Sequence, residues 1–290
     1  MGQLTNYSEN LLADFLRGSG FSSWPVIFYM GLASAATDGS VTELSGNGYA
    51  RVSYGQSLLL WAGTQGSGTT LVSSGNTHTT SNNAAIAFAT PGTGGWGTAT
   101  HAVFYSAATA GNALIYAELT TSIACTAGAT VSLGVGAIAL SLGLTGGATD
   151  YLVNKLIDFM FRGQTYAAPA NWYFALFTTS PTNAGGGIEV SGGNYSRPGI
   201  PANITALSST NGPTTTGAST GGTTGQIFNN SSIAYPAPNA TWGTVTTEGV
   251  LDAALAGNLL FYSPLTVPRT VLSASSPQTH AISTWSLTID

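Results

Sequence analysis

The chain carries one sequence twice. Residues 96–119 read WGTATHAVFYSAATAGNALIYAEL and residues 242–265 read WGTVTTEGVLDAALAGNLLFYSPL, and 12 of these 24 aligned positions are identical at a constant offset of 146 residues. Because the chain has 290 residues, each copy has about 145 residues, which is an ordinary size for one domain. The duplication therefore restricts the fold to one that half of the chain can form, present in two copies.

The match between the two halves extends beyond this stretch. Two more pairs of segments correspond, namely YSENLLADFL at 7–16 with YLVNKLIDFM at 151–160, and ELSGNGYAR at 43–51 with EVSGGNYSR at 189–197. We predict two tandem domains, residues 1–146 and residues 147–290, joined by a short connection. Two copies are too few for a solenoid, which needs at least three stacked repeats.

Each half is predicted to begin with a helix. In the first half, apolar residues at helical spacing follow Tyr7 and stop before Gly18, and Asn6 with Glu9 fits a capping box. In the second half, either Thr149 or Asp150 is expected to cap the helix. One N-terminal helix per domain follows from this pattern.

The rest of each half predicts β-structure. Short runs rich in β-branched and aromatic residues, such as VIFYMGLA at 26–33, AAIAFA at 84–89 and NWYFALFTT at 171–179, are bounded by Gly, Asn, Pro and Thr. Strands at such short intervals are typical of an antiparallel sandwich. The predicted fold class is therefore mainly β, with two tandem antiparallel β-sandwich domains that each carry one N-terminal α-helix.

No membrane partner is expected. The most apolar run, VSLGVGAIALSLGL at 131–144, is too short to span a bilayer. Its alternation of apolar residues changes phase, which predicts a strand with a bulge. The first residues, MGQLTNYSEN, lack the basic and apolar regions of a signal peptide.

The chain is unusually poor in charge. Only 6% of its residues are charged, against about 25% in a typical soluble protein. Five arginines and one lysine are scattered along it, so no basic stripe could neutralise phosphates and no nucleic-acid partner is expected. The net charge of −5 offers little repulsion between copies, which favours assembly of the chain with itself.

Two polar loops rich in Thr, Ser and Gly occupy the same place in both halves, at 63–83 and 207–226. Long loops of this kind in compact domains are either functional or loosely ordered. We expect these loops, the segment before Tyr7, or both to reach an adjacent subunit.

No catalytic residue, metal ligand or cofactor site is predicted. The sequence GASTG around Ser219 fits G-x-S-x-G, but it lies in a loop without the flanking strand and helix of a nucleophile elbow, and the first half has no such motif. His78, His101 and His280 share no metal-ligand spacing, and Cys125 is the single cysteine. We therefore predict that the protein is not an enzyme and has no cofactor.

The residues kept by the duplication are expected to be structural. They are Glu43, Tyr49, Arg51 and Trp96 in the first half, and Glu189, Tyr195, Arg197 and Trp242 in the second. We expect each arginine to form an ion pair with the glutamate or hydrogen bonds with the backbone of its own domain, with the tyrosine in the core. Each tryptophan should be buried at a turn. A subunit contact made twice is the alternative role.

These signatures together resemble a family of tailed-bacteriophage virion proteins. The second half carries the resemblance in VNKLIDFMFRG, PANWYFALFTTSPTNAGGGIEVSGGNYSR, ATWGTVT and DAALAGNLLFYSPL, and the first half departs from it in GLASAATDGSVTELSGNGYAR, which lacks the proline and the glycine triplet. The resemblance covers most of both halves. It implies a tail-associated or head-decorating component of the phage particle without an enzymatic role.

The predicted function is accordingly that of a virion structural protein that decorates or cements the capsid or forms part of the tail. Its expected partners are further copies of itself and other virion proteins, and a trimer would present six similar domains. The alternative is a carbohydrate- or receptor-binding tail appendage, which exposed aromatic residues in one groove would favour. The tryptophans without a counterpart, Trp24, Trp61, Trp172 and Trp285, are expected in the core instead.

Overall fold

The computed structural model describes residues 2–20, 24–142, 144–145, 147–221 and 225–289. The chain forms two compact units. Unit 1 contains Met1–Leu11, Ser22–Leu142 and Asn154–Tyr166, and unit 2 contains Leu12–Phe21, Gly143–Val153 and Ala167–Asp290. The units therefore do not follow the order of the sequence, because each contains a short segment from the other half of the chain. The repeat boundary between residues 146 and 147 stays a prediction.

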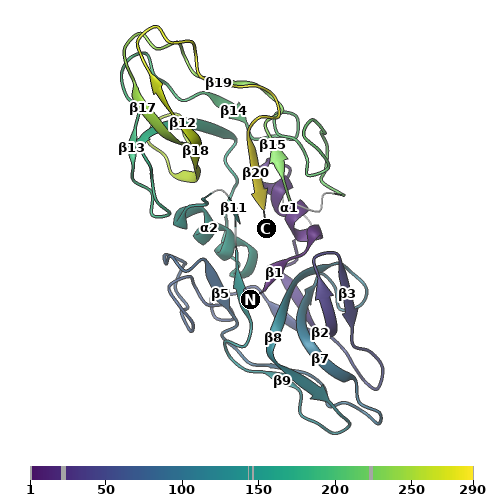
Figure 1. The fold of residues 1–290 in the computed structure, drawn as a ribbon. Helices are drawn as coiled ribbons and strands as arrows, with labels where there is room; N and C mark the ends of the chain where they lie inside the picture. The colour runs from purple at the N-terminus through teal and green to yellow at the C-terminus, as the bar shows by residue number, and fades with distance from the viewer. Residues whose placement is uncertain (1, 21–23, 143, 146, 222–224, 290) are drawn as a thin grey trace. The chain divides into compact units, whose positions relative to one another are not determined.

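Two helices are present in the described residues, one at the start of each repeat: α1 (Asn6–Leu16) and α2 (Asp150–Phe161) (Figure 1). Thr5 caps α1, since its Oγ1 accepts a hydrogen bond from the amide of Ser8 at 3.4 Å. The predicted cap at Asn6 is wrong by one residue, because Asn6 is already helical. Thr149 caps α2 in the same way, through the amide of Leu152 at 3.4 Å.

Unit 1 is built on an antiparallel sheet. In the described residues its strand order is β1-β8-β7-β2-β3, with β4 also paired to β2. The strands are β1 (Gln3–Leu4), β2 (Ile27–Thr37), β3 (Ser40–Glu43), β4 (Val52–Gly55), β7 (Gly97–Tyr105) and β8 (Ala113–Cys125). The long central strands β7, β2 and β8 lie side by side in Figure 1 and match the apolar runs of the sequence.

Unit 2 repeats this sheet. Its order is β13-β12-β17-β18, with β14 also paired to β12. The strands are β12 (Asn171–Thr179), β13 (Ile188–Glu189), β14 (Gly199–Pro201), β17 (Gly243–Leu251) and β18 (Leu259–Val271). Strand β12 pairs with β17, which pairs with β18, just as β2 pairs with β7 and β7 pairs with β8.

Short antiparallel pairs complete each unit. In unit 1, β5 (Thr79–Ser81) pairs with β10 (Ala139–Ser141), and β6 (Ile86–Ala87) pairs with β9 (Ser132–Leu133). In unit 2, β16 (Ile233–Ala234) pairs with β19 (Thr279–His280). Also in unit 2, β20 (Ser286–Ile289) lies between β11 (Leu144–Thr145) and β15 (Ile227–Phe228). The single bulged strand predicted at 131–144 is wrong. A turn at Gly136, with φ of 71°, separates β9 from β10, which pair with different strands.

Aromatic side chains fill both cores. In unit 1 the ring of Phe28 lies 6.1 Å from that of Trp61 and 5.8 Å from that of Phe104. In unit 2 the ring of Trp285 lies 5.7 Å from that of Trp172. The predicted fold class is confirmed: the chain is mainly β, with antiparallel sheets in tandem domains that each have an N-terminal helix.

The two repeats differ most in the hairpin after their first long strand. In the first repeat Asp38 and Gly39 join β2 directly to β3. In the second repeat a longer loop contains Gly185, Gly186 and Gly187, which all have positive φ, and a Cβ on Gly187 would lie 2.7 Å from the carbonyl oxygen of Thr179. The glycine triplet is therefore required by the longer loop, which the first repeat lacks.

Candidate functional site

The predicted structural residues of the first repeat form one cluster. Arg51 and Glu43 make a two-pronged ion pair, with Nε to Oε1 at 2.8 Å and Nη2 to Oε2 at 2.7 Å. The hydroxyl of Tyr49 donates to Oε1 of Glu43 at 2.9 Å and accepts the amide of Leu32 at 2.7 Å. The ring of Tyr49 meets that of Trp96 edge-on at 5.2 Å. Residues from three separate segments thus meet on the edge of the main sheet.

The second repeat reproduces this cluster. Arg197 and Glu189 pair through the same atoms at 2.8 and 2.6 Å. The hydroxyl of Tyr195 donates to Glu189 at 3.0 Å, and its ring lies 5.3 Å from that of Trp242. The predicted ion pairs are therefore present in both repeats, each within its own unit.

Each arginine also holds a loop between two long neighbouring strands of its sheet, β7 and β8 in unit 1 and β17 and β18 in unit 2. Nη1 of Arg51 donates to the carbonyls of Ala107 and Ala110 at 2.7 and 2.6 Å, in the loop between β7 and β8. Arg197 does the same at Ala253 and Ala256, at 2.8 and 2.7 Å. A planar guanidinium with five donors suits this task, because it bonds a carboxylate and two carbonyls at once. The cluster is a clamp on a hairpin loop.

Burial and nearby charges keep the tyrosine and arginine of each clamp in the protonated forms that its hydrogen bonds require. Burial raises the pKa of Tyr49 and that of Tyr195, so both phenols stay protonated and donate to the glutamate. Burial lowers the pKa of Arg51, but the hydrogen bond and charge of Glu43 outweigh it, and the net shift is upward. Arg51 also stacks over the ring of Tyr105, with 3.4 Å between Cζ and the ring centroid.

Neutralising either glutamate of a clamp should weaken its domain. Glu43→Gln keeps the shape but removes the charge that Arg51 pairs with, so we expect the free energy of unfolding to fall by about 1.5–3 kcal/mol, the usual range for a hydrogen bond to a charged group. Glu189→Gln should cost a similar amount, because the geometry is the same. Urea denaturation measures both, with Glu118→Gln at an exposed position as the control. Equal behaviour of Glu43→Gln and this control would contradict the clamp.

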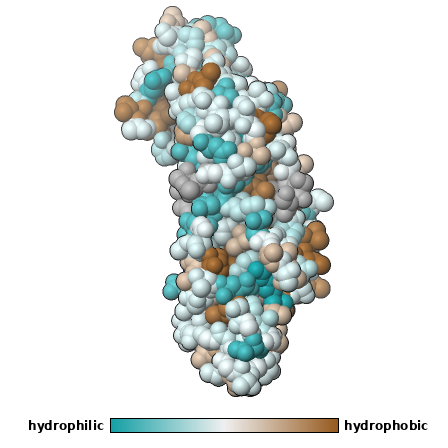
Figure 2. All heavy atoms as spheres, turned by 90° about the vertical axis from the view of Figure 1, so that its right-hand side faces the viewer, coloured by the Kyte–Doolittle hydropathy of each residue, from teal (hydrophilic) through white to brown (hydrophobic). Residues whose placement is uncertain are grey.

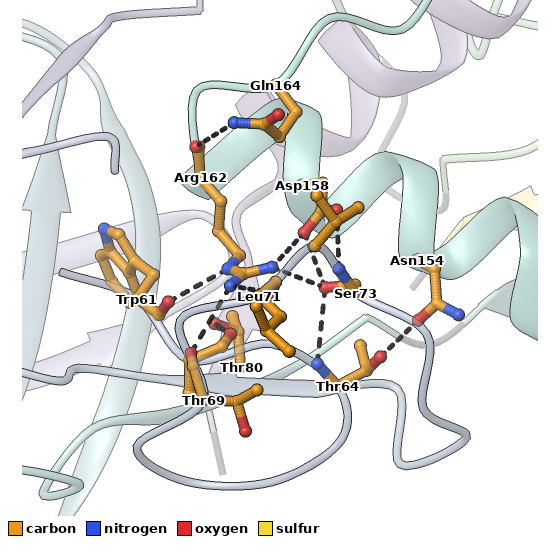
Figure 3. A network of polar contacts seen from close by, with 12 residues as sticks. Trp61, Thr64, Thr69, Leu71, Ser73, Thr80, Asn154, Asp158, Arg162 and Gln164 are labelled. Atoms are coloured by element: carbon orange, nitrogen blue, oxygen red, sulfur yellow. Dashed lines mark hydrogen bonds and ion pairs between the residues drawn. The ribbon is translucent and has the colours of Figure 1, made fainter. Parts of the chain in front are cut away.

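A second duplicated network was not predicted as a site, and Figure 3 shows it in unit 1. Arg162, the residue directly after α2, is fully buried and pairs with Asp158 of that helix at 2.5 Å. Asp158 also accepts the amide of Ser73 at 2.8 Å and its hydroxyl at 2.6 Å. The remaining donors of Arg162 reach backbone carbonyls, those of Trp61 at 3.0 Å and Leu71 at 2.5 Å. The guanidinium therefore organises the polar loop at 63–83.

Unit 2 contains the matching network. Arg17, the residue directly after α1, is fully buried and pairs with Asp14 of that helix at 2.7 Å. Asp14 accepts the amide of Ser219 at 2.9 Å and its hydroxyl at 2.7 Å. Arg17 donates to the carbonyls of Leu207 at 3.1 Å and Gly217 at 3.0 Å. Burial lowers the pKa of Arg17, and the adjacent Asp14 opposes that shift.

Ser219 therefore has a structural partner. Its hydroxyl bonds the carboxylate of Asp14 and the guanidinium of Arg17. The first repeat lacks the G-x-S-x-G pattern, but Ser73 takes the same part at the same offset of 146 residues. That offset, with the matched aspartate on each helix and the matched arginine directly after it, is the signal in the sequence that could have revealed the network.

The paired asparagines of the repeats also act in the fold. Asn82 is fully buried and bridges separate segments, donating to the carbonyl of Gly134 at 2.7 Å and accepting the amide of Ile138 at 2.9 Å. Asn229 donates to Ala281 at 2.8 Å and accepts the amide of Trp285 at 2.9 Å. A buried amide side chain that bonds backbone on both sides replaces ladder hydrogen bonds that these irregular segments lack.

One pocket of unit 2 has a mainly apolar lining and encloses a polar cluster. It has a volume of about 560 Å3 in unit 2, and it contains the buried carboxylate of Glu248. Tyr235 donates to Glu248 at 2.9 Å, and Nε2 of His280 lies 2.9 Å from the same oxygen. At the equivalent positions the first repeat has Ala102 in place of Glu248 and Leu133 in place of His280, since Leu133 pairs with Ile86 as His280 pairs with Ile233. The duplication therefore does not preserve this pocket.

The stability of the strands around this pocket is expected to depend on pH. The hydrogen bond with Glu248 raises the pKa of His280, although burial and the charge of Arg269 lower it, and Tyr235 also faces Glu248. Protonated His280 therefore stabilises the folded state. This stabilisation is complete below about pH 6.5, the ordinary pKa of histidine, and is lost as the pH rises through the raised pKa of His280. We expect amide exchange in β16 and β19, corrected for intrinsic rates, to accelerate from pH 6 to pH 9. His280→Gln should abolish the trend, and acceleration toward low pH would contradict it.

Three other features that could indicate a function in the described part of the chain are a metal site, a reactive thiol and a membrane-spanning helix. No three His, Cys, Asp or Glu side chains gather there in a way that could hold a metal ion. Cys125 is buried and reduced, and burial raises the pKa of its thiol. Among the helices described, none is sufficiently long and apolar to cross a membrane.

The surface is close to neutral. Arg17, Arg51, Arg162 and Arg197 are all engaged in ion pairs inside the units, so the outer surface carries even less charge than the composition suggests. Figure 2 shows a face of mostly intermediate hydropathy, with scattered hydrophilic and hydrophobic spots. Most of the tryptophans do not add to this surface, because Trp24, Trp61, Trp96, Trp172 and Trp242 are buried and Trp285 is only partly exposed.

A duplicated mainly β fold, held by internal ion pairs under a surface poor in charge, is an architecture that suits a structural protein. The family described as podophage GP4 fiber I protein gp80 matches the chain over residues 3–141 and again over residues 147–288. The chain therefore belongs to this family, with two tandem copies of its domain, and is a structural component of the phage particle. No curated protein matches it.

Proposed function

We propose that this protein is a non-enzymatic building block of the phage fibre and that it assembles with itself through its near-neutral surface. The family description names a fibre protein, which favours the tail apparatus over decoration of the capsid. A trimer is the closed assembly that we expect, since three chains present six similar domains and match the threefold and sixfold symmetries of phage particles.

One observation carries this proposal: the side chains that the duplication keeps act inside the fold. The clamps at Arg51 and Arg197 hold hairpin loops, and the networks at Arg17 and Arg162 hold the polar loops. These contacts stabilise a scaffold, and they leave a surface with little charge to oppose packing against neighbours. A repeated scaffold with such a surface suits a structure made of many copies.

The alternative, a carbohydrate- or receptor-binding appendage, gains no support from the tryptophans. Such a site would present aromatic faces in a groove, whereas Trp61 and Trp172 are fully buried and pack on other core rings. Only Trp285 of the described tryptophans is partly exposed, and its ring meets that of Phe174 at 5.3 Å. The position of these tryptophans in the core favours a structural role over a binding role.

Two measurements test the proposal. Native mass spectrometry of the isolated chain should give a multiple of its 29.3 kDa mass, with three as the expected number. Cryo-electron microscopy of the phage particle should then place the chain in the fibre. Density on the capsid would overturn the fibre assignment, and a monomer burying less than about 800 Å2 against every neighbour would overturn the assembly.

A further inference from the structure

Each helix is shared between the two compact units. Residues up to Leu11 of α1 belong to unit 1, and the helix from Leu12 onward belongs to unit 2. Helix α2 divides in the opposite sense, with residues up to Val153 in unit 2 and residues from Asn154 in unit 1. Each unit therefore contains the end of the helix that begins in the other unit.

Each helix starts on the sheet of its own repeat. The hydroxyl of Thr5, which caps α1, donates to the carbonyl of Ala113 at 2.7 Å, at the start of β8. The hydroxyl of Thr149, which caps α2, donates to the carbonyl of Leu259 at 2.5 Å, at the start of β18. Equivalent residues thus anchor equivalent helix starts in the two units.

Each helix ends on the polar loop that comes from the other repeat. In unit 1 the loop at 63–83 holds Asp158 and Arg162, which follow its Ser73 by 85 and 89 residues. In unit 2 the loop at 207–226 holds Asp14 and Arg17, which precede it by nearly 200 residues. Apolar contact supports the polar one, since the ring of Phe161 lies 5.3 Å from that of Trp61 in the core of unit 1.

We propose that the end of each helix is an exchanged docking element, and that its partner is the polar loop of a second copy of the same repeat. The aspartate and arginine of the helix are the recognition pair, and the serine with the backbone carbonyls of the loop is their receptor. This chain supplies both copies in tandem, so it is a covalently joined, swapped dimer of the repeat.

The matching of the two networks supports exchange between copies. The receptor groups of the two loops, Trp61, Leu71 and Ser73 in one and Leu207, Gly217 and Ser219 in the other, all correspond at the offset of 146. Because the receptors are alike, the helix end of any copy meets the same groups on any other copy. Copies of the repeat on separate chains can therefore link in the same way.

Hydrogen–deuterium exchange of the full chain tests this proposal through a crossed response. Asp158→Asn should speed amide exchange around Ser73 by about tenfold or more, because that amide donates to the lost charge, and should leave the loop around Ser219 unchanged. Asp14→Asn should speed exchange around Ser219 and leave the loop around Ser73 unchanged.

The reverse variants keep the test independent of general unfolding. Ser73→Ala should loosen the end of α2 and not that of α1, and Ser219→Ala should loosen the end of α1 and not that of α2. Amides of β7 and β17 should keep their protection throughout. If a variant loosens the loop of its own repeat, or both loops equally, the exchange is overturned.

Discussion

Replacing Arg162 with methionine should lower the free energy of unfolding by about 3–5 kcal/mol, the usual loss when one partner of a buried ion pair is removed. The arginine is fully buried, and its removal leaves Asp158 charged in the interior. It also leaves the carbonyls of Trp61 and Leu71 without their donor. Scanning calorimetry should show the transition of the affected domain shifted down by on the order of 10 °C.

Three further substitutions serve as comparisons for Arg162→Met. Arg17→Met should behave like Arg162→Met, because the two networks share their geometry. Arg269→Met makes the same chemical change at an exposed position, so it should stay within about 0.5 kcal/mol of the parent. Arg162→Lys should recover only part of the loss, since an ammonium cannot reach a carboxylate and separate carbonyls together. If Arg162→Met and Arg269→Met are equally stable, the network does not hold the fold.

The second large effect is expected in the core of unit 1. Trp61→Ala should cost about 3–5 kcal/mol, the usual loss for a large aromatic residue in a core. Trp61 has no exposed surface, and its ring touches those of Phe104 and Phe161, each at 5.3 Å. The substitution therefore leaves a cavity at the point where the end of α2 meets the sheet of unit 1.

Chemical denaturation followed by tyrosine and tryptophan fluorescence measures this loss. The neighbouring Leu59 is 72% exposed, so Leu59→Ala is a matched control that should change stability by no more than about 0.5 kcal/mol. Because Trp61 lies where the exchanged helix packs, Trp61→Ala should also speed amide exchange at the end of α2. A loss of stability below about 1 kcal/mol would show that the cluster around Trp61 collapses to fill the gap.

The exchange of helix ends gives the duplication a physical use. In a single-copy domain the polar loop needs a helix end from another molecule, and the association then depends on concentration. Joining two copies makes the encounter intramolecular, so that its effective concentration is set by the short connection. The proposed fibre subunit would then be complete before it meets its neighbours.

The sequence by itself determined the repeated unit and most of its local structure. The constant offset identified two copies, the apolar runs located β2, β6 and β12, and the matched Glu43 and Arg51 predicted an ion pair within the domain. These features depend on residues close together in sequence or on periodicity, which is why they can be read without a structure. The cap at Thr5 and the break between β9 and β10 were missed because each depends on a difference of one or two residues.

Only the tertiary structure decided which helix meets which loop. Asp14 and Arg17 match Asp158 and Arg162 so closely that the sequence permits each pair to bind the loop of its own repeat or of the other. The local chemistry of both arrangements is the same, so no pattern along the chain distinguishes them. The choice depends on the direction in which each helix leaves its sheet and on the long-range packing at its far end, and both exist only in the folded chain.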